Sequence, residues 1–252
     1  MALGGGGARG VAHIAYLKAM EELGIKPCIV SGTSSGAIVG ALYAGGMSPD
    51  DMLAMLNNMS GGKKNSGLIK AVAKIKKDLV SSAARKTLDG LLPVRRFDEL
   101  RIPLKVVATN INTLQERVFT KGSILDALMC STALPGSLLP QMYGDQYYID
   151  GGATNIVPFD IIRDDCDILV AIDVSQVRPN TRKPTTQTAQ IAEWAAAQEA
   201  LISLKLKGSK VDVLERPTFE GVSTMEFDKF NQVYKRAEEL VPDFKRKLEK
   251  FI

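Results

Sequence analysis

Histidine and cysteine are scarce in this sequence, and both shortages exclude classes of protein. The 252 residues include one histidine and three cysteines. Cys28, Cys130 and Cys166 are too few and too widely spaced for a disulfide framework or a zinc site, so we expect three buried thiols in a reducing compartment. No apolar run reaches the roughly 18 residues of a membrane-spanning helix, and the first residues lack a signal-peptide pattern. We therefore expect a cytoplasmic protein.

The single histidine limits how a serine can be activated. Gly32-Thr33-Ser34-Ser35-Gly36 follows a short apolar run and precedes a helical pattern, which is the G-x-S-x-G arrangement of a nucleophile elbow. A serine hydroxyl needs a base beside it, and the usual base is histidine. His13 lies upstream of Ser34, and this order excludes the succession of Ser, Asp or Glu, and His found in α/β-hydrolases. If Ser34 is a nucleophile, its base is another group.

A glycine-rich stretch at 4–10 supplies a second requirement of ester cleavage. The tetrahedral intermediate carries a negatively charged oxygen, and backbone N–H groups must point at it. Glycines allow successive amides to converge, and a helix that begins near Arg9 adds partial positive charge at the same place. The amides that we expect to form this oxyanion hole are those of Gly5, Gly6, Gly7 and Ala8.

Asp150 is the candidate base. A carboxylate can replace histidine in this role if it is buried, oriented and close to the hydroxyl. Asp150 ends an apolar strand pattern, and Gly151-Gly152 allow the chain to turn tightly after it. An Asp-Gly pair is also common in ordinary turns, so a structural role is the alternative.

The pattern Gly5-x-Gly7-x-x-Gly10 also matches a dinucleotide-binding fingerprint. That fingerprint requires an acidic residue at the end of the second strand, about twenty residues further on. The second predicted strand ends in Ile29-Val30-Ser31 and has no acidic residue there. We therefore expect no nicotinamide or flavin, and we expect no other cofactor or metal.

Strand and helix patterns alternate along the whole chain. We expect strands at 1–4, 28–30, 104–109, 117–120, 147–149, 168–174 and 211–214. We expect helices at 9–23, 35–43, 48–60, 67–92, 124–130, 189–206 and 227–252, the last interrupted at Pro242. This alternation predicts a single α/β domain over 1–252, a three-layer sandwich with a mainly parallel central sheet and helices on both faces.

Positive charge is concentrated in one part of the chain. Between residues 63 and 105 there are twelve basic and four acidic residues, whereas the whole chain has a net charge of +4. We expect a basic helical insertion or lid at about 61–100. Its field would attract an anionic membrane surface, such as the inner face of the cell membrane, and the alternative is a solvated basic face. We expect no nucleic-acid partner.

Three ordered motifs resemble the signature blocks of the patatin-like phospholipases. They are Gly5-Gly6-Gly7-Ala8-Arg9-Gly10, Gly32-Thr33-Ser34-Ser35-Gly36 and Asp150-Gly151-Gly152. The segments Ala108-Thr109, Ser131-Thr132-Ala133-Leu134-Pro135-Gly136 and Asn155-Ile156-Val157-Pro158 also resemble segments of bacterial members. Asn110 departs from the aspartate that many members carry after the threonine. The resemblance covers most of the chain.

The resemblance implies a lipid acyl hydrolase that uses a Ser-Asp dyad without histidine. Ser34 would be the nucleophile, Asp150 the base and the amides around Gly6 and Gly7 the oxyanion hole, acting on a phospholipid or another fatty-acyl ester. Two alternatives stay open at this point. One is a non-catalytic regulatory protein with the same fold, and the other is an acyltransferase that uses the same dyad with an alcohol as acceptor.

Overall fold

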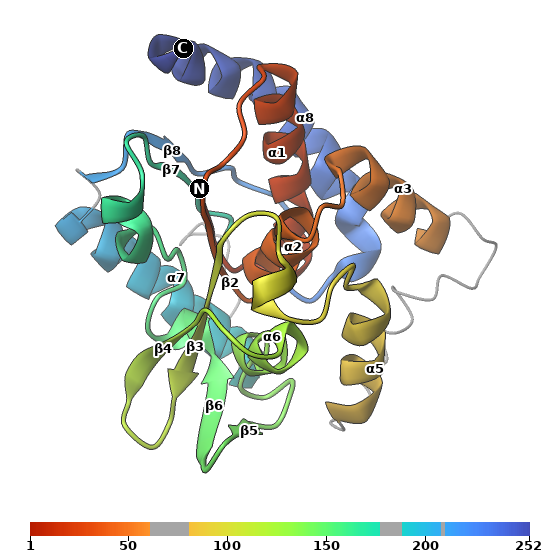
Figure 1. The fold of residues 1–252 in the computed structure, drawn as a ribbon, viewed down its shortest axis with the longest axis vertical. Helices are drawn as coiled ribbons and strands as arrows, with labels where there is room; N and C mark the ends of the chain where they lie inside the picture. The colour runs from red at the N-terminus through yellow and green to blue at the C-terminus, as the bar shows by residue number, and fades with distance from the viewer. Residues whose placement is uncertain (61–80, 177–187, 208–209) are drawn as a thin grey trace.

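A mixed β-sheet lies at the centre of the structure, which is a computed structural model that describes residues 1–60, 81–176, 188–207 and 210–252 (Figure 1). Among the described residues the sheet has eight strands, connected in the order β5-β6-β3-β2-β1-β7-β8, with β4 also paired to β3. The strands are β1 (Ala2–Leu3), β2 (Val30–Thr33), β3 (Leu104–Asn110), β4 (Gln115–Phe119), β5 (Gln141–Tyr143), β6 (Gln146–Asp150), β7 (Val170–Ile172) and β8 (Val213–Glu215).

The sheet is parallel in its central part and antiparallel at one side. The pairs β3-β2, β2-β1, β1-β7 and β7-β8 are parallel, whereas β3-β4, β3-β6 and β5-β6 are antiparallel. The parallel strands β1, β2 and β7 are buried along their whole length, because helices cover both faces and every second side chain points to each face.

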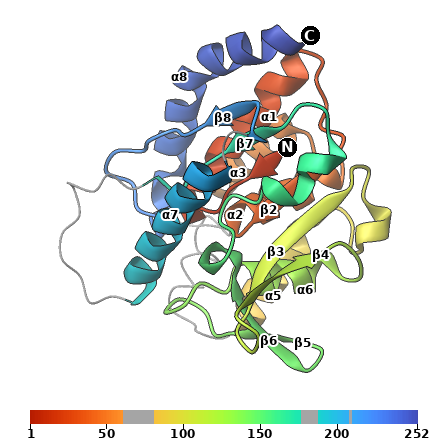
Figure 2. The same cartoon turned by 90° about the vertical axis from the view of Figure 1, so that its left-hand side faces the viewer.

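Helices form the two outer layers, which confirms the predicted three-layer α/β arrangement (Figures 1 and 2). They are α1 (Ala12–Glu22), α2 (Ser35–Ala44), α3 (Pro49–Ser60), α5 (Ser81–Leu91), α6 (Ile124–Ser131), α7 (Thr188–Lys207) and α8 (Phe230–Leu248). A large apolar core joins one face of the sheet to α1, α2, α3, α5, α6 and α8. A smaller core on the other face joins it to α7 and to the short helix η4 (Asp160–Asp165).

Within the described residues most predicted elements agree with the structure to within a few positions, and the part of the predicted 67–92 helix before residue 81 lies outside these residues. β2 begins and ends later than the predicted 28–30 strand, and the sequence pattern gave no sign of β5. The predicted interruption at Pro242 is wrong, because α8 continues through this residue. A proline inside a helix can bend it instead of ending it, and α8 bends along its length in both views (Figures 1 and 2).

One further prediction concerns a segment that is described only in part. The basic insertion expected at about 61–100 includes 61–80, which lies outside the described residues, and its later part contains α5. It remains a prediction that this segment acts as a lid. Within the described residues, no helix is both long enough and apolar enough to cross a membrane.

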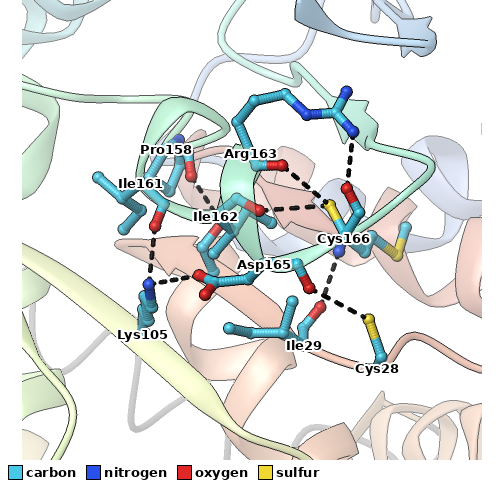
Figure 3. Close-up of polar contacts among 11 residues, drawn as sticks. Cys28, Ile29, Lys105, Pro158, Ile161, Ile162, Arg163, Asp165 and Cys166 are labelled. Carbon is cyan, nitrogen blue, oxygen red and sulfur yellow. Dashed lines mark hydrogen bonds and ion pairs between the residues drawn. The ribbon is translucent and has the colours of Figure 1, made fainter.

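The prediction of three buried thiols is correct for Cys130 alone. Cys28 is exposed and Cys166 is partly exposed. Both thiols donate to carbonyl oxygens near η4: Cys28 to Asp165, with the sulfur 3.9 Å from the oxygen, and Cys166 to Ile162 at 3.3 Å (Figure 3). Cys28 and Cys166 therefore lie where the segment before β2 meets η4, near the surface, whereas Cys130 lies in the core.

Lys105, the second residue of strand β3, is held in the same region (Figure 3). Its ammonium group donates to a carboxylate oxygen of Asp165 at 2.6 Å and to the carbonyl oxygen of Ile161 at 2.8 Å. One residue of the basic stretch is therefore part of the contact between β3 and η4 and does not form a free basic face.

Helix α2 packs closely on β1 because its first turn contains a glycine. A Cβ atom at Gly36 would collide with the carbonyl oxygen of Leu3. The residue before this helix is Ser34, so the contact with β1 also determines where Ser34 lies relative to the sheet.

We predict that Gly36→Ala lowers the free energy of unfolding by roughly 1–3 kcal/mol, because a backbone atom must move to admit the methyl group. Gly90→Ala is the matched control, since Gly90 is an exposed helical residue in α5 with open space around it. That control should raise the stability by up to ~1 kcal/mol. Denaturant unfolding measures both, and equal effects at the two glycines would contradict the close packing of α2.

Candidate active site

Ser34 lies in a strained turn between β2 and α2. Its backbone has φ 53° and ψ −122°, a conformation that side-chain-bearing residues rarely adopt and that costs roughly 1–3 kcal/mol. The turn is fixed by Ser131 at the end of α6, whose hydroxyl oxygen accepts from the Ser34 N–H at 2.9 Å. The Ser131 hydroxyl itself donates to the carbonyl oxygen of Val107 at 2.6 Å. This geometry is that of the predicted nucleophile elbow.

Strand pairing along β3 brings Asp150 to Ser34. Because β4 pairs with β3 from Val106 to Asn110, β2 and β6 share the opposite edge of β3. β2 runs parallel to β3 and ends at Thr33, opposite Val107, whereas β6 runs antiparallel and ends at Asp150, opposite Ala108. The carboxyl ends of β2 and β6 therefore meet, and the residues at these ends face each other.

The carboxylate of Asp150 is buried and hydrogen-bonded at this meeting point. Asp150 is 5% exposed, and its Oδ1 accepts from the N–H of Gly152 at 2.8 Å. Burial raises the pKa of Asp150 from its ordinary value of 3.8 to about 6. Hydrogen bonds from the Ser34 side chain and the Gly152 amide oppose this rise because they stabilise the carboxylate. The structure thus pairs the predicted nucleophile with the predicted base.

His13 has no place in this pair. It is fully buried in α1, and its Nε2 donates to the carbonyl oxygen of Gly4 at 2.8 Å. Burial lowers the pKa of His13 to about 4, so the ring is neutral near pH 7. His13 therefore holds the glycine-rich stretch through the carbonyl of Gly4. The titratable group that lines a cavity with Ser34 is the carboxylate of Asp150.

The glycine-rich stretch lies against the elbow, but most of its predicted oxyanion donors have partners. The N–H of Gly5 donates to the carbonyl oxygen of Ile156 at 2.9 Å, and that of Ala8 donates to Thr224 at 2.8 Å. The N–H of Gly6 donates to the hydroxyl oxygen of Ser35 at 3.1 Å. Within the described part of the chain, no hydrogen bond is found for the N–H of Gly7. Gly7, which lines both cavities that Ser34 lines, is therefore the amide of this set without a partner among the described residues.

The backbone at Gly7 also requires glycine. Its φ is 56°, and a Cβ atom there would collide with the carbonyl group of Thr224. Arg9 is buried beside it and holds the loop, since its Nε donates to the carbonyl oxygen of Val222 at 3.0 Å and its Nη1 to that of Gln176 at 3.3 Å. Arg9 thus braces the loop and does not offer a charged group to a substrate.

The remaining motif glycines lie at close contacts around the pair. Added Cβ atoms would collide with the Ser35 side chain at Gly10, the α2 backbone at Gly32, the Val107 carbonyl at Gly151 and the Ile156 side chain at Gly152. Together with Gly36, they allow the three motifs to approach one another. Metal binding finds no support among the described residues, where no group of three or more His, Cys, Asp or Glu side chains converges.

Two cavities meet at Ser34. The first has a volume of about 210 Å³ and an almost wholly apolar lining. It lies between α1, α2, α3 and α5, and its walls include Ile14, Ile38, Leu42, Met52, Leu88 and Phe230. The second has a volume of about 250 Å³ and is lined by Asp150, Gly6, Gly7, Ile156 and Ala196. Ser34 lines both, so it lies between an apolar cavity and a cavity that contains the carboxylate of Asp150.

Ser131 and Ser35 are site residues whose roles the sequence did not reveal. Ser131 holds the Ser34 amide, and Ser35 accepts from the Gly6 amide. A weak signal existed for Ser131, since it begins one of the segments shared with bacterial patatin-like proteins. Its contact with Ser34 joins positions 97 residues apart in sequence, so no local pattern could predict it.

Comparison with known proteins agrees with this geometry. The family model described as patatin-like phospholipase matches residues 1–163. The chain is 28% identical to patatin-like phospholipase domain-containing protein 6 of Mus musculus, over 93% of this chain and 19% of that protein. It is 28% identical to lysophospholipase NTE1 of Chaetomium globosum, over 93% of this chain and 17% of that protein. The chain thus spans about a fifth or less of the length of these relatives.

A solved structure shares the fold. VipD from Legionella pneumophila superposes with a TM-score of 0.54 at 16% sequence identity, over 96% of this chain and 65% of that one. At this identity the likeness concerns the fold alone. The fold and the family match together establish that this chain belongs to the patatin-like phospholipase family.

We predict that Asp150→Asn stabilises the protein at pH 8. The folded state binds more protons than the unfolded state between pH 3.8 and about 6, so this group's contribution to stability is greatest at low pH and falls as pH rises through that window. The pKa difference corresponds to roughly 3 kcal/mol as an upper limit. The variant should therefore exceed the wild type in free energy of unfolding at pH 8, and the difference should vanish near pH 4.

His13 affects the pH dependence of stability in the direction opposite to Asp150, and it does so equally in the wild type and the variant. The pKa of His13 is lowered to about 4, so its contribution to stability rises with pH between about 4 and 6.5 and cancels when the two proteins are compared. Denaturant unfolding across this range is the measurement. A variant that is less stable than the wild type by the same amount at every pH would contradict a buried, destabilised carboxylate.

Proposed function

We propose that this chain is a serine lipid acyl hydrolase, a carboxylic ester hydrolase in which Ser34 is the nucleophile and Asp150 the general base. The observation that carries the proposal is that the ends of β2 and β6 meet, so that Ser34 and the buried carboxylate of Asp150 line the same cavity. Burial makes this carboxylate a stronger base than a solvated one, because the neutral form is favoured where water is excluded.

The proposed reaction has two steps. Asp150 accepts the hydroxyl proton while the Ser34 oxygen attacks the acyl carbonyl carbon, and the protonated Asp150 then gives this proton to the leaving alcohol or lysolipid. The result is an acyl ester of Ser34. Asp150 next takes a proton from water, whose oxygen attacks the acyl carbon, and the proton returns to the Ser34 oxygen as the fatty acid leaves. No atom or electron is required from a cofactor.

Backbone groups would stabilise the negative oxygen of both tetrahedral intermediates. The N–H of Gly7 is the donor best supported by the geometry, and the first turn of α2, which begins at Ser35, adds the partial positive charge of a helix N-terminus. The Gly6 amide can join this set if the Ser35 hydroxyl yields to the substrate oxygen. The strained backbone of Ser34 holds the hydroxyl against these groups before substrate binds.

The apolar cavity supports a fatty-acyl substrate. Its walls offer almost no polar atoms, so a hydrocarbon chain gains the free energy of leaving water when it enters, roughly 0.8 kcal/mol for each methylene. Met52 and Met55 line this cavity with flexible side chains that can adapt to chains of different shape. The names of the relatives, phospholipase and lysophospholipase, favour phospholipids or lysophospholipids as the class of substrate.

The two alternatives differ from this proposal in measurable ways. A non-catalytic protein would not turn over any ester, and the presence of Ser34, Asp150 and the Gly7 amide around the same cavity argues against it. An acyltransferase would use the same acyl-enzyme but favour an alcohol over water, and product analysis with and without added alcohol separates the two.

We further propose a cytoplasmic protein that contacts an anionic membrane through the basic stretch. Arg85, Arg95 and Arg96 each form an ion pair with an aspartate, so these described arginines are partly neutralised. Any remaining attraction rests largely on the lysines between 63 and 77, which lie outside the described residues.

We predict that Ser34→Ala lowers kcat/KM for a water-soluble short-chain ester by at least ~10³-fold, because the acyl-enzyme can no longer form. Asp150→Asn should be nearly as damaging, since the amide cannot accept the proton. Thermal unfolding should show that both variants remain folded. Ser137→Ala is the control, because Ser137 lines the apolar cavity but lies away from Asp150's cavity. Full activity of either dyad variant would reject the assignment.

The pH dependence of activity gives a second prediction. The reactive form carries ionised Asp150, so kcat/KM for a soluble ester should rise tenfold per pH unit below about 6 and level off above about 7. The assay is initial-rate hydrolysis between pH 5 and pH 8, corrected for spontaneous hydrolysis. A rate that does not change over this range would count against Asp150 as the base.

A further inference from the structure

Exposed apolar side chains gather on two neighbouring β-hairpins. One hairpin joins β3 to β4 and carries Ile111 and Leu114, and the other joins β5 to β6 and carries Met142 and Tyr147. Leu114 is 79% exposed and Met142 is 66% exposed, and a group of such side chains is informative where a single one is not. Leu139, just before β5, is also exposed. We call these five residues the hairpin patch.

Backbone contacts hold the two hairpins together. The N–H of Ile111 donates to the carbonyl oxygen of Tyr147 at 3.0 Å, and the N–H of Tyr147 donates to the side-chain oxygen of Asn112 at 2.9 Å. Met142 and Tyr147 are directly opposite each other in the β5-β6 pair, so their side chains lie on the same face. Both views show the hairpins side by side and projecting from the lower end of the molecule (Figures 1 and 2).

The backbone at Leu114 does not account for a leucine. Its φ is 59°, a conformation in which glycine or asparagine is less strained than leucine. The side-chain oxygen of Asn110 accepts from the N–H groups of Asn112 and Thr113 and so fixes the turn without any contribution from the Leu114 side chain. A strained position that bears an exposed leucine indicates a role outside the fold.

The hairpin patch lies beyond the edge of the sheet at which Ser34 and Asp150 meet. Ala108 is level with Asp150, and β3 continues past it to Asn110 and the hairpin turn, so the turn projects further in the direction of that edge. A second connection runs through the chain: Leu134 and Leu138 line the apolar cavity, and the next residue is exposed Leu139. The wall of the apolar cavity and the patch are therefore adjacent along the chain at Leu138 and Leu139.

The charges around the patch favour a lipid surface as its partner. The segments 110–116 and 139–147 contain no lysine or arginine, and their acidic residues are Glu116 and Asp145. An anionic headgroup would gain nothing here, whereas the hydrocarbon region of a bilayer would receive leucine and methionine directly. Tyr147 adds a ring with a hydroxyl group, which suits the depth of the headgroups. Two projecting hairpins can enter a bilayer without burying the large flat area of a protein interface.

We propose that the hairpin patch inserts into the surface of a neutral phospholipid bilayer and holds the mouth of the apolar cavity against it. The inference rests on the proposed function, because it states that the lipid substrate is presented to the protein in a bilayer. The patch would bind the bilayer through apolar contacts that do not depend on salt concentration. This binding is therefore independent of the basic stretch. A substrate molecule can then leave the bilayer on the side of the molecule where Ser34 and Asp150 meet and close to Leu138 in the cavity wall.

The test is co-sedimentation of the full chain with phosphatidylcholine vesicles at low and at high salt. The variant is Leu114→Asn combined with Met142→Thr, because asparagine tolerates a positive φ and threonine suits a strand. The control is Leu206→Gln, since Leu206 is equally exposed, at 77%, but lies at the end of α7 away from the hairpins (Figure 2). We expect the double variant to bind about tenfold more weakly or worse, and the control to bind as the wild type does.

Activity assays locate the defect. Hydrolysis of a water-soluble short-chain ester should be unchanged in the double variant, whereas hydrolysis of lipid presented in vesicles should fall with binding. A second variant, Leu114→Trp, keeps an apolar side chain and should show enhanced, blue-shifted fluorescence when neutral vesicles are added. This readout remains if the double variant does not fold.

Three results would overturn the proposal. They are equal vesicle binding by the double variant and the wild type, binding that requires anionic lipid and disappears at high salt, and concentration-dependent self-association that the double variant abolishes without any vesicle binding. Failure of the proposed function looks different. In that case the wild type hydrolyses no ester, yet it binds neutral vesicles through the patch, and Ser34→Ala binds them equally well.

Discussion

The contact between the Ser34 side chain and a carboxylate from which water is excluded is the interaction on which the rest of the site depends. An aspartate in solution is too weak a base to activate an alcohol, and burial raises the pKa of Asp150 to about 6. Strand pairing holds the Asp150 carboxylate in this unfavourable buried position, because β2 and β6 end against each other along β3. Both residues occupy costly states, Ser34 in its backbone and Asp150 in its burial.

Glycines at close contacts allow the backbone segments of the site to approach one another. Gly36 brings α2 onto β1, and Gly7 brings the loop against the carbonyl of Thr224, so the elbow, the loop and the end of β6 converge. The two cavities then divide the surroundings of one hydroxyl group into an apolar side and a side that carries the carboxylate. In the proposed reaction the apolar cavity receives the acyl chain, and Asp150 in the other cavity accepts the proton. The hairpin patch is proposed to hold the apolar cavity against a bilayer.

Much of the site could be predicted from sequence because its motifs are local. The G-x-S-x-G turn, the glycine-rich stretch and Asp-Gly-Gly each record a backbone requirement in a few adjacent residues. The partners of the loop amides could not be predicted, because Ile156, Thr224 and the Ser35 hydroxyl reach the loop only through tertiary packing. The same holds for Ser131. β5 is only three residues long and is a strand because it pairs with β6. α8 continues past Pro242 because its packing outweighs one missing hydrogen bond.

The central claim is that Asp150 activates Ser34, and the rate of covalent labelling tests it most directly. A fluorophosphonate probe reacts with an activated serine hydroxyl without depending on which lipid is the substrate. Intact-protein mass spectrometry should show one adduct on Ser34 in the wild type, formed at a rate that rises with pH through about 6. In Asp150→Asn the rate should fall by at least ~10²-fold and lose this pH dependence. Equal labelling rates in the two proteins would contradict the account.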